Sequence, residues 1–505
     1  MNPTPIAYHQ STGYARYAME PHYMDWQHQP DPYKSYPGRD GVSLPEIQDI
    51  FDQDFFDGDI QDVYDDCRLK KTADAPDLKT LSKICMLAGG LTARLRQGGR
   101  SFYYRSAPSA GALYPNEIYF AAFDCKMLPA GIYHYGVHNR FLTRLRSGNF
   151  ANKMASVVFG LQKDLAGVFI ISGIFFRSAW KYRKRAYRYL LLDGGHLAEN
   201  LRLAITAAGF QYSLHYAFDD RNLDELLGLD ESREGSLCCI HITGGKSQGA
   251  FPKARISELP KSVRDAGRVS PAEVVYPEIT DIHEASKIVK ESHSAAGKMI
   301  SSLGISPSKW DSVVPKAKMD TVEFNYSATV FKRRSKRNFI PAPIGKNQLS
   351  YMLNLLCRAS GYMIDENPDV ALSACIGFLA GNIKGIDPGF YLLDPVAQKT
   401  GRVFSGNMIE KMAAVCLDQA WLKNAAVHFV FMSNLTLLEK EWGARSYRYA
   451  MMTAGRLGHS VYLGATAQGL GCCGIGAFYD NEAKQQLKLN EVSAMLYLVA
   501  VGNTK

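Results

Sequence analysis

Residues 105–119 combine a cation, a loop of very small side chains and an apolar run, Arg105-Ser-Ala-Pro-Ser-Ala-Gly-Ala-Leu-Tyr-Pro-Asn-Glu-Ile-Tyr119. Ser109, Ala110 and Gly111 have almost no side chain, so their backbone N–H groups are able to approach a flat ligand closely. Prolines on both sides of this loop restrict φ. The pattern predicts either a ligand-binding loop or an ordinary turn that feeds a buried strand.

Two later stretches have the chemistry of an anion site. Lys332-Arg-Arg-Ser-Lys-Arg-Asn-Phe339 offers several cations and a hydroxyl, which suit a phosphate and a polyol chain. Gly469-Leu-Gly-Cys-Cys-Gly-Ile-Gly-Ala477 is rich in glycine, so its backbone N–H groups are able to reach the edge of a ligand. The alternative for the first stretch is a solvated basic turn.

Composition is that of a globular protein of 505 residues, long enough for about two to four domains. Neither an apolar run of membrane-spanning length nor a secretory signal is recognised, and we expect a cytoplasmic protein with reduced thiols. The formal charge of +9 favours an anionic ligand or a solvated basic surface. Cys238-Cys239 and Cys472-Cys473 lie in apolar runs without metal-ligand spacing, so we expect core cysteines and no metal site.

Helical and strand patterns alternate along the chain. The spacing predicts a helix over 77–92, a buried strand over 166–172, a long helix from Trp180 to Ala208, a strand over 237–242 and an amphipathic helix near 279–293.

The second half repeats the first at a shift of 260 positions, as in 447 − 187. Tyr187-Arg-Tyr189 then falls on Tyr447-Arg-Tyr449, and the match continues without a gap through the following helix. The repeat predicts two copies of one α+β unit packed as an intrachain pseudo-dimer. We expect an N-terminal aromatic arm at 1–45, a first domain at 46–246, a connector at 247–330 and a second domain at 331–505.

Differences between the copies indicate where chemistry resides. The small-residue loop has no counterpart in the second copy, where the matched region reads Pro368-Asp-Val-Ala-Leu-Ser-Ala. Lys181-Tyr182 falls on Glu441-Trp442, so that pair is also confined to the first copy. The alternative for Lys181-Tyr182 is a residue pair at the start of a basic helix.

With these motifs the chain resembles the nitroreductase superfamily, and within it the SagB/ThcOx-type dehydrogenases, which include azoline dehydrogenases. The resemblance is carried by Tyr8-His9, Pro32-Tyr-Lys-Ser-Tyr36, the 105–115 stretch, Lys181-Tyr182 and Leu192-Asp-Gly-Gly-His196, and in the second copy by Arg333–Arg337 and Gly474–Gly476. It implies an α+β fold with two tandem nitroreductase-like domains, each with a mostly antiparallel central sheet flanked by helices.

The resemblance also implies FMN and assigns its contacts. The phosphate, ribityl chain and N5 edge would be held by residues of the second copy, namely Arg333, Arg334, Ser335, Arg337, Gly474, Ile475 and Gly476. Pro108, Ser109, Ala110 and Gly111 of the first copy would border the flavin, and Lys181 and Tyr182 would act at the reacting centre. We therefore expect one FMN per chain. A vestige of a second phosphate clamp is one alternative for His9, Ser11 and Thr12, and a segment without that role is the other.

The expected activity is hydride transfer from a thiazoline- or oxazoline-type peptide ring to the flavin, with Lys181 as base and Tyr182 sharing the proton or orienting the ring. The alternatives are an NAD(P)H-dependent nitro- or quinone reductase and a non-catalytic scaffold of a peptide-modification complex. Family members work with cyclodehydratase partners. We expect no nucleic-acid or membrane partner, although further homo-oligomerisation stays open. Asp193, His196 and Glu199 are predicted to be helix-surface or packing residues.

Overall fold

The computed structural model describes residues 3–19, 23–46, 58–66, 74–97, 100–161, 165–244, 258–290, 299–312 and 324–505. The chain divides into two compact units. The first unit contains Tyr23–Asp57 and Asp65–Val289, and the second unit contains Met1–His22, Gly58–Tyr64 and Lys290–Lys505. The expected N-terminal arm therefore contributes residues to both units.

The described part of the first unit contains a seven-stranded sheet in the order β1-β6-β5-β4-β7-β9-β8, with every neighbouring pair antiparallel. Its strands are β1 (Gly41–Ser43), β4 (Asn116–Ala122), β5 (Gly131–Gly136), β6 (Phe141–Ser147), β7 (Leu165–Ile174), β8 (Tyr212–His215) and β9 (Glu234–Thr243). β7 and β9 are buried along almost their whole length, as their continuous apolar sequences predict.

The second unit repeats this arrangement in the order β10-β13-β12-β11-β14-β16-β15, again antiparallel throughout the described residues. Its strands are β10 (Asp311–Ser312), β11 (Cys375–Ala380), β12 (Gly389–Asp394), β13 (Lys399–Ser405), β14 (Val427–Asn434), β15 (Gly471–Ile475) and β16 (Ser493–Gly502). The predicted fold class, an α+β chain with two tandem units around antiparallel sheets, is confirmed.

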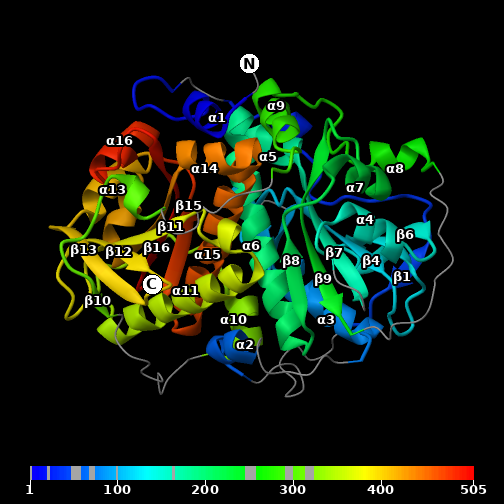
Figure 1. Ribbon diagram of the computed structural model, residues 1–505, viewed down its shortest axis with the longest axis horizontal. Coiled ribbons are helices and arrows are strands. Elements are labelled where there is room, and N and C mark those ends of the chain that lie inside the picture. The colour runs from blue at the N-terminus through cyan, green and yellow to red at the C-terminus, as the bar shows by residue number, and fades with distance from the viewer. Residues whose placement is uncertain are drawn as a thin grey trace. The chain divides into compact units, whose positions relative to one another are not determined.

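Helices cover the sheets in both units (Figure 1). The first unit contains α3 (Leu78–Gly89), α4 (Ala151–Val157), α5 (Phe175–Tyr182), α6 (Ala186–Ala207), α7 (Asp220–Leu227), α8 (Lys261–Asp265) and α9 (Pro277–Ala285). The second contains α1 (Pro5–Ser11), α10 (Tyr326–Lys332), α11 (Lys346–Glu366), α12 (Pro368–Ala371), α13 (Ile409–Val415), α14 (Leu435–Trp442), α15 (Ser446–Ala467) and α16 (Asp480–Gln486), and α2 (Ile60–Asp66) as far as Tyr64.

Alternation along the strands separates two helical layers in the first unit. α3 and α6 pack together on one face, where an added Cβ on Gly89 would contact Ile118 of β4 and Leu197 of α6. Tyr119 and Ala121, the alternate residues of β4, belong to a buried cluster on the other face with side chains of α4 and α7. β4 is thus buried on both faces.

Three predicted elements differ in their bounds. The long helix expected from Trp180 is broken: α5 ends at Tyr182, Arg183 adopts φ +50°, and α6 begins at Ala186. The helix expected at 77–92 ends at Gly89, because Gly90 caps it and the following residues form a strand. The amphipathic helix near 279–293 runs over Pro277–Ala285, and residues 291–293 lie outside the described part of the chain.

Candidate active site

The small-residue loop lies in the first unit between β3 (Arg100–Arg105) and β4. Its backbone is tightly folded, with φ of +66° at Gly111, +54° at Ala112 and +47° at Tyr114. At non-glycine residues such conformations cost about 1–3 kcal/mol each, so contacts from elsewhere must hold them. Exposure increases along the loop, from buried Pro108 through half-buried Ser109 and Ala110 to exposed Gly111.

Asp193 of α6 supplies one of these contacts. The hydroxyl of Ser109 donates to its carboxylate at 2.6 Å, and the Ala110 N–H donates to both carboxylate oxygens at 3.1 Å. Ser109 Oγ in turn accepts from the Tyr114 N–H at 2.8 Å. Burial raises the pKa of Asp193 to about 7, against the effect of these donors. Of the two alternatives expected for Asp193, the buried packing position agrees with the structure and the helix-surface position does not.

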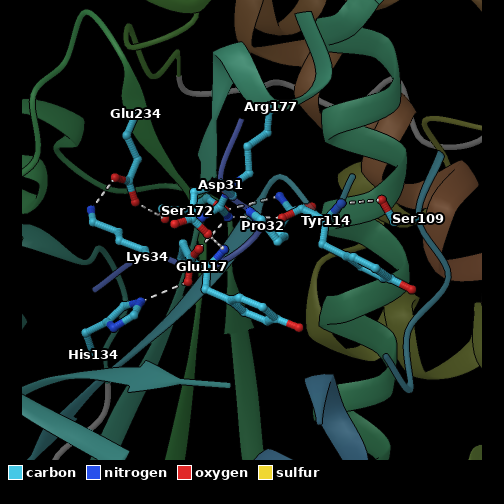
Figure 2. A network of polar contacts seen from close by, with 12 residues as sticks. Asp31, Pro32, Lys34, Ser109, Tyr114, Glu117, His134, Ser172, Arg177 and Glu234 are labelled. Atoms are coloured by element: carbon cyan, nitrogen blue, oxygen red, sulfur yellow. Dashed lines mark hydrogen bonds and ion pairs between the residues drawn. The ribbon is translucent and has the colours of Figure 1, made fainter. Parts of the chain in front are cut away.

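Arg177 of α5 holds the other end of the loop. Its guanidinium donates to the Tyr114 carbonyl at 3.1 Å and to the Asp31 carbonyl at 2.9 Å, and it pairs with the buried Glu117 (Figure 2). His134 lies 2.8 Å from the same carboxylate. Burial alone would raise the pKa of Glu117, but Arg177 and His134 keep that pKa well below its usual range.

A second buried pair fixes the motif at 32–36 beside this loop. Lys34 lies 2.5 Å from Glu234 (Figure 2). Its ammonium group also donates to the Tyr119 hydroxyl at 2.8 Å. Burial lowers the pKa of Lys34, yet the Glu234 carboxylate outweighs it and raises that pKa above its usual value. The segment held in this way presents the Pro32 carbonyl, which accepts from Arg105 at 2.7 Å. The 32–36 motif, the 105–115 stretch and Asp193 therefore meet in one polar network.

Lys181 and Tyr182 lie at the C-terminal end of α5, directly against the loop. A Cβ placed on Gly111 would lie 2.9 Å from the Tyr182 hydroxyl oxygen and 3.3 Å from Lys181 Nζ. The Tyr182 ring packs on the Tyr189 ring with centroids 4.2 Å apart, and both predicted catalytic side chains are half-buried. The structure thus brings Gly111, Lys181 and Tyr182 together.

A cavity of about 20 Å³ borders the loop and is lined by Arg105, Pro108, Ser109, Tyr114 and Asp193 among others. Space of this size accommodates about one water molecule, so a flavin ring does not fit there. The side of the loop that remains for a large ligand is the one that carries exposed Gly111.

The predicted phosphate segment and glycine loop meet in the second unit. Ser335 pairs with Cys472 in an isolated parallel bridge, and its hydroxyl lies 2.8 Å from that of Tyr462. The Gly474 N–H donates to the same Tyr462 hydroxyl at 2.6 Å. A Cβ on Gly474 would lie 1.8 Å from the Tyr497 hydroxyl oxygen, so a larger residue at this position would displace the Tyr497 side chain. Tyr462, which sequence reasoning missed, connects the two segments.

The arginines of this segment have different surroundings. Arg333 is buried with its guanidinium carbon 5.6 Å from the Tyr462 ring centroid, whereas Arg337 is exposed and lies 5.8 Å from that of Trp421. Arg334 donates to the carbonyls of Phe331 and Arg333. Ile475 is buried and Gly476 is half-buried. Guanidinium groups beside a serine hydroxyl form a donor set that fits a phosphate and a polyol chain.

Residues 9–12 fasten α1 within the second unit. His9 Nε2 lies 3.4 Å from Asp480, and its Nδ1 lies 3.1 Å from the Tyr447 hydroxyl. The hydroxyls of Ser11 and Thr12 donate to the Tyr8 carbonyl. These contacts give the segment a packing role, and its interpretation as a vestigial phosphate clamp stays a prediction.

Glu199 and His196, the other two residues of α6 predicted as helix-surface or packing residues, are buried. Glu199 forms an ion pair with Arg202 at 2.6 Å, and His196 is buried, so neither lies on a helix surface. All nine described cysteines are thiols, and burial raises the pKa of Cys85 to about 12. Among the described residues, none of the helices combines the length and hydropathy of a membrane span, and His, Cys, Asp and Glu form no metal-binding group of three.

The chain belongs to the nitroreductase family, whose model matches residues 66–246 and 378–503, one stretch in each half. Membership confirms the family resemblance and identifies the chain as an oxidoreductase of a family that typically uses a flavin. A solved structure described as a nitroreductase from Anabaena variabilis covers 99% of both chains with a TM-score of 0.76 and 23% identity. The tandem fold therefore recurs over the whole length of that chain.

Curated relatives match shorter stretches. A nitroreductase of Methanocaldococcus jannaschii is 27% identical over 180 residues, which is 35% of this chain and 91% of the relative. The trifolitoxin-processing protein TfxB of Rhizobium leguminosarum is 30% identical over 145 residues, 27% of this chain and 39% of TfxB. The trifolitoxin operon protein TfxC of the same organism is 31% identical over 107 residues, 21% of this chain and 30% of TfxC. This chain spans less than two fifths of either trifolitoxin protein, and these matches fit the SagB-type resemblance.

Proposed function

We propose that this chain is an FMN-dependent dehydrogenase that oxidises a thiazoline- or oxazoline-type ring, or a related group, in a peptide-derived substrate. The observation that carries the proposal is the contact of the Gly111 backbone with Lys181 and Tyr182. The similarity to a protein named for trifolitoxin processing supports a substrate of that kind. A partner of the cyclodehydratase type is part of the proposal and follows from the family resemblance.

FMN, when bound, supplies the hydride acceptor. Arg333, Arg334, Ser335 and Arg337, with Gly474–Gly476, would hold its phosphate, ribityl chain and N5 edge, and Pro108–Gly111 would border the ring. Because the small-residue loop and the arginine segment each occur once in the described residues, we propose one FMN per chain. A reproducible ratio of two would contradict this stoichiometry.

Conversion of an azoline to an azole removes one hydride and one proton from adjacent ring atoms. In our proposal Lys181 Nζ accepts the proton, for which the amine must be neutral when substrate is bound. The Tyr182 hydroxyl orients the ring or shares that proton. The loop held by Asp193 and Arg177 keeps Gly111 in place beside both groups.

The test begins with the visible spectrum and the FMN-to-chain ratio of the purified full chain. A thiazoline-containing peptide is then incubated with the holoprotein, and azole formation is measured as a loss of 2 Da. We expect Lys181→Ala and Tyr182→Phe to retain FMN and to lose turnover by roughly 100-fold or more, as is usual for a proton-transfer group. Lys184→Ala is the matched control, because Lys184 is exposed in the same basic run. Full turnover in both site variants would eliminate the assigned roles.

The second candidate is an NAD(P)H-dependent nitro- or quinone reductase, which is favoured by the match to 91% of the M. jannaschii nitroreductase. Anaerobic mixing of the holoprotein with NADH and NADPH separates the two functions. Rapid bleaching of the flavin supports the reductase, whereas an unchanged flavin spectrum supports the peptide dehydrogenase.

A further inference from the structure

A two-stranded hairpin separates α3 from the loop in the first unit. β2 (Leu91–Gln97) pairs antiparallel with β3, and the two form a sheet of their own. In the second unit, α11 is followed directly by α12 and β11, so that no such hairpin occurs at the matched position. Like the loop and the Lys181-Tyr182 pair, the hairpin is confined to the half that carries the proposed reacting groups.

One face of the hairpin presents apolar side chains to solvent. Leu95 and Phe102 lie opposite each other across the two strands, and their exposed fractions are 44% and 46%. Directly opposed side chains form the interacting units of a sheet, so this pair is a continuous apolar contact area. The next pair, Arg94 and Tyr103, faces the other way, with the guanidinium 5.6 Å from the ring centroid.

The hairpin carries charge of one sign, and both of its edges lack a pairing strand within the part of the chain that the structure describes. Among the described residues, no third strand pairs with β2 or β3. A lone two-stranded sheet is marginal in water, and its edges offer unpaired N–H and C=O groups to an extended chain. Residues 91–105 contain four arginines and no Asp or Glu, and Arg94 and Arg96 are exposed. This charge opposes pairing with a second copy of the hairpin and favours an acidic segment.

We propose that the β2–β3 hairpin is the docking site for an extended, acidic segment of the peptide substrate, which adds to the sheet as a third strand. Main-chain hydrogen bonds would supply affinity, Leu95 and Phe102 would contact alternate apolar side chains, and Arg94 and Arg96 would select acidic ones. This inference rests on the proposed function, because it gives the peptide a binding element separate from the reacting ring.

The covalent connection between the hairpin and the loop explains why docking here would serve the reaction. β3 ends at Arg105, whose N–H donates to the Tyr114 hydroxyl at 3.1 Å and whose guanidinium carbon lies 4.7 Å from the Tyr114 ring centroid. A strand of seven residues spans roughly 20 Å, so a peptide on the hairpin would extend from its far end to the loop.

The experiment uses a fluorescein-labelled eight-residue peptide that alternates glutamate with valine, and a lysine–valine peptide of equal length as the matched probe. Each is titrated with the FMN-loaded full chain at low salt and followed by fluorescence anisotropy. We expect binding of the acidic peptide alone, weakened by salt. Leu95→Ser/Phe102→Ser and Arg94→Glu/Arg96→Glu should each raise its Kd about tenfold or more. Arg221→Glu on α7 is the charge control, with Kd unchanged.

Several outcomes would overturn the proposal: no binding of the acidic peptide, equal binding of the lysine–valine peptide, or full binding by both hairpin variants. Loss of a concentration-dependent dimer in Leu95→Ser/Phe102→Ser without peptide binding would instead assign the face to a second copy. The milder Arg94→Gln/Arg96→Gln variant provides the test if charge reversal prevents folding. Every variant is also checked for FMN content, because a chain that binds the peptide but no FMN refutes the proposed function and leaves the docking site standing.

Discussion

Replacing Asp193 with asparagine tests the anchor of the loop through its effect on stability at different pH values. Asp193 is buried, accepts from Ser109 and Ala110, and has a pKa raised to about 7. An aspartate in the unfolded chain has a pKa of about 3.9. The asparagine side chain would keep one acceptor oxygen in the same place but would not titrate. A comparison of Asp193→Asn with the parent chain therefore isolates this single ionisation.

The sign follows from proton binding. Between about pH 4 and pH 7 the folded state holds a proton on Asp193 that the unfolded state has lost. The unfolding free energy of the parent chain therefore falls as the pH rises through this range. One proton held across one pH unit corresponds to about 1.4 kcal/mol, and about two pH units separate pH 5 from the folded pKa. From pH 5 to pH 8 the variant should therefore gain about 3 kcal/mol of unfolding free energy relative to the parent chain.

The assay is urea unfolding of both chains at pH 5 and pH 8, with hydrogen exchange of the peptide containing Ala110 as the local readout. Asp224→Asn is the matched control: burial also raises the pKa of Asp224 to about 7, but this carboxylate accepts from Ser236. We expect both variants to show the pH-dependent gain and only Asp193→Asn to accelerate exchange at Ala110. An equal difference between variant and parent at the two pH values would refute the raised pKa. Unchanged exchange would refute the anchor.

Three further substitutions test other parts of the site. Gly111→Ala combines a φ of +66° with a Cβ 2.9 Å from the Tyr182 hydroxyl, and should weaken FMN binding about tenfold in a flavin titration while the chain stays folded. Glu117→Gln should cost about 3–5 kcal/mol in urea unfolding, because it leaves the buried Arg177 charge uncompensated. Gly474→Ala should cost about 1–3 kcal/mol in thermal unfolding, and removal of the Tyr497 hydroxyl by Tyr497→Phe should restore part of the loss.

Periodicity and the internal repeat predict much of the fold, because both depend on residue type at fixed spacing. α6 and α15 each contain 22 residues and begin 260 positions apart, as the repeat requires. The contact of the loop with Lys181-Tyr182 also agrees with the expected grouping, since both motifs are confined to the same half.

Partners that meet only in three dimensions could not be predicted in this way. Lys34 and Glu234 are 200 positions apart, and Tyr462 contacts Ser335 from 127 positions away. The break between α5 and α6 depends on the positive φ of Arg183, and an arginine in the sequence does not predict this backbone conformation. Asp193 did leave a signal, because a carboxylate followed by two glycines inside an apolar helix is unusual. The structure explains this pattern, because the buried Asp193 carboxylate accepts from donors of the neighbouring loop.

The position matched to Asp193 in the second unit shows how the two halves diverged. There Thr453 of α15 donates to the Val370 carbonyl at 3.0 Å, in the segment that replaces the loop. The same helix position thus contacts the same segment in both units. Asp193 accepts from the loop, whereas Thr453 donates to the Val370 carbonyl and also accepts from the Ser373 hydroxyl at 3.3 Å. A carboxylate needs N–H and O–H donors, and the loop that supplies them leaves Gly111 exposed beside Lys181. The Thr453 hydroxyl donates to a carbonyl of α12, and the side chain of Val370 is buried. The matched segment of the second unit therefore has a packing role.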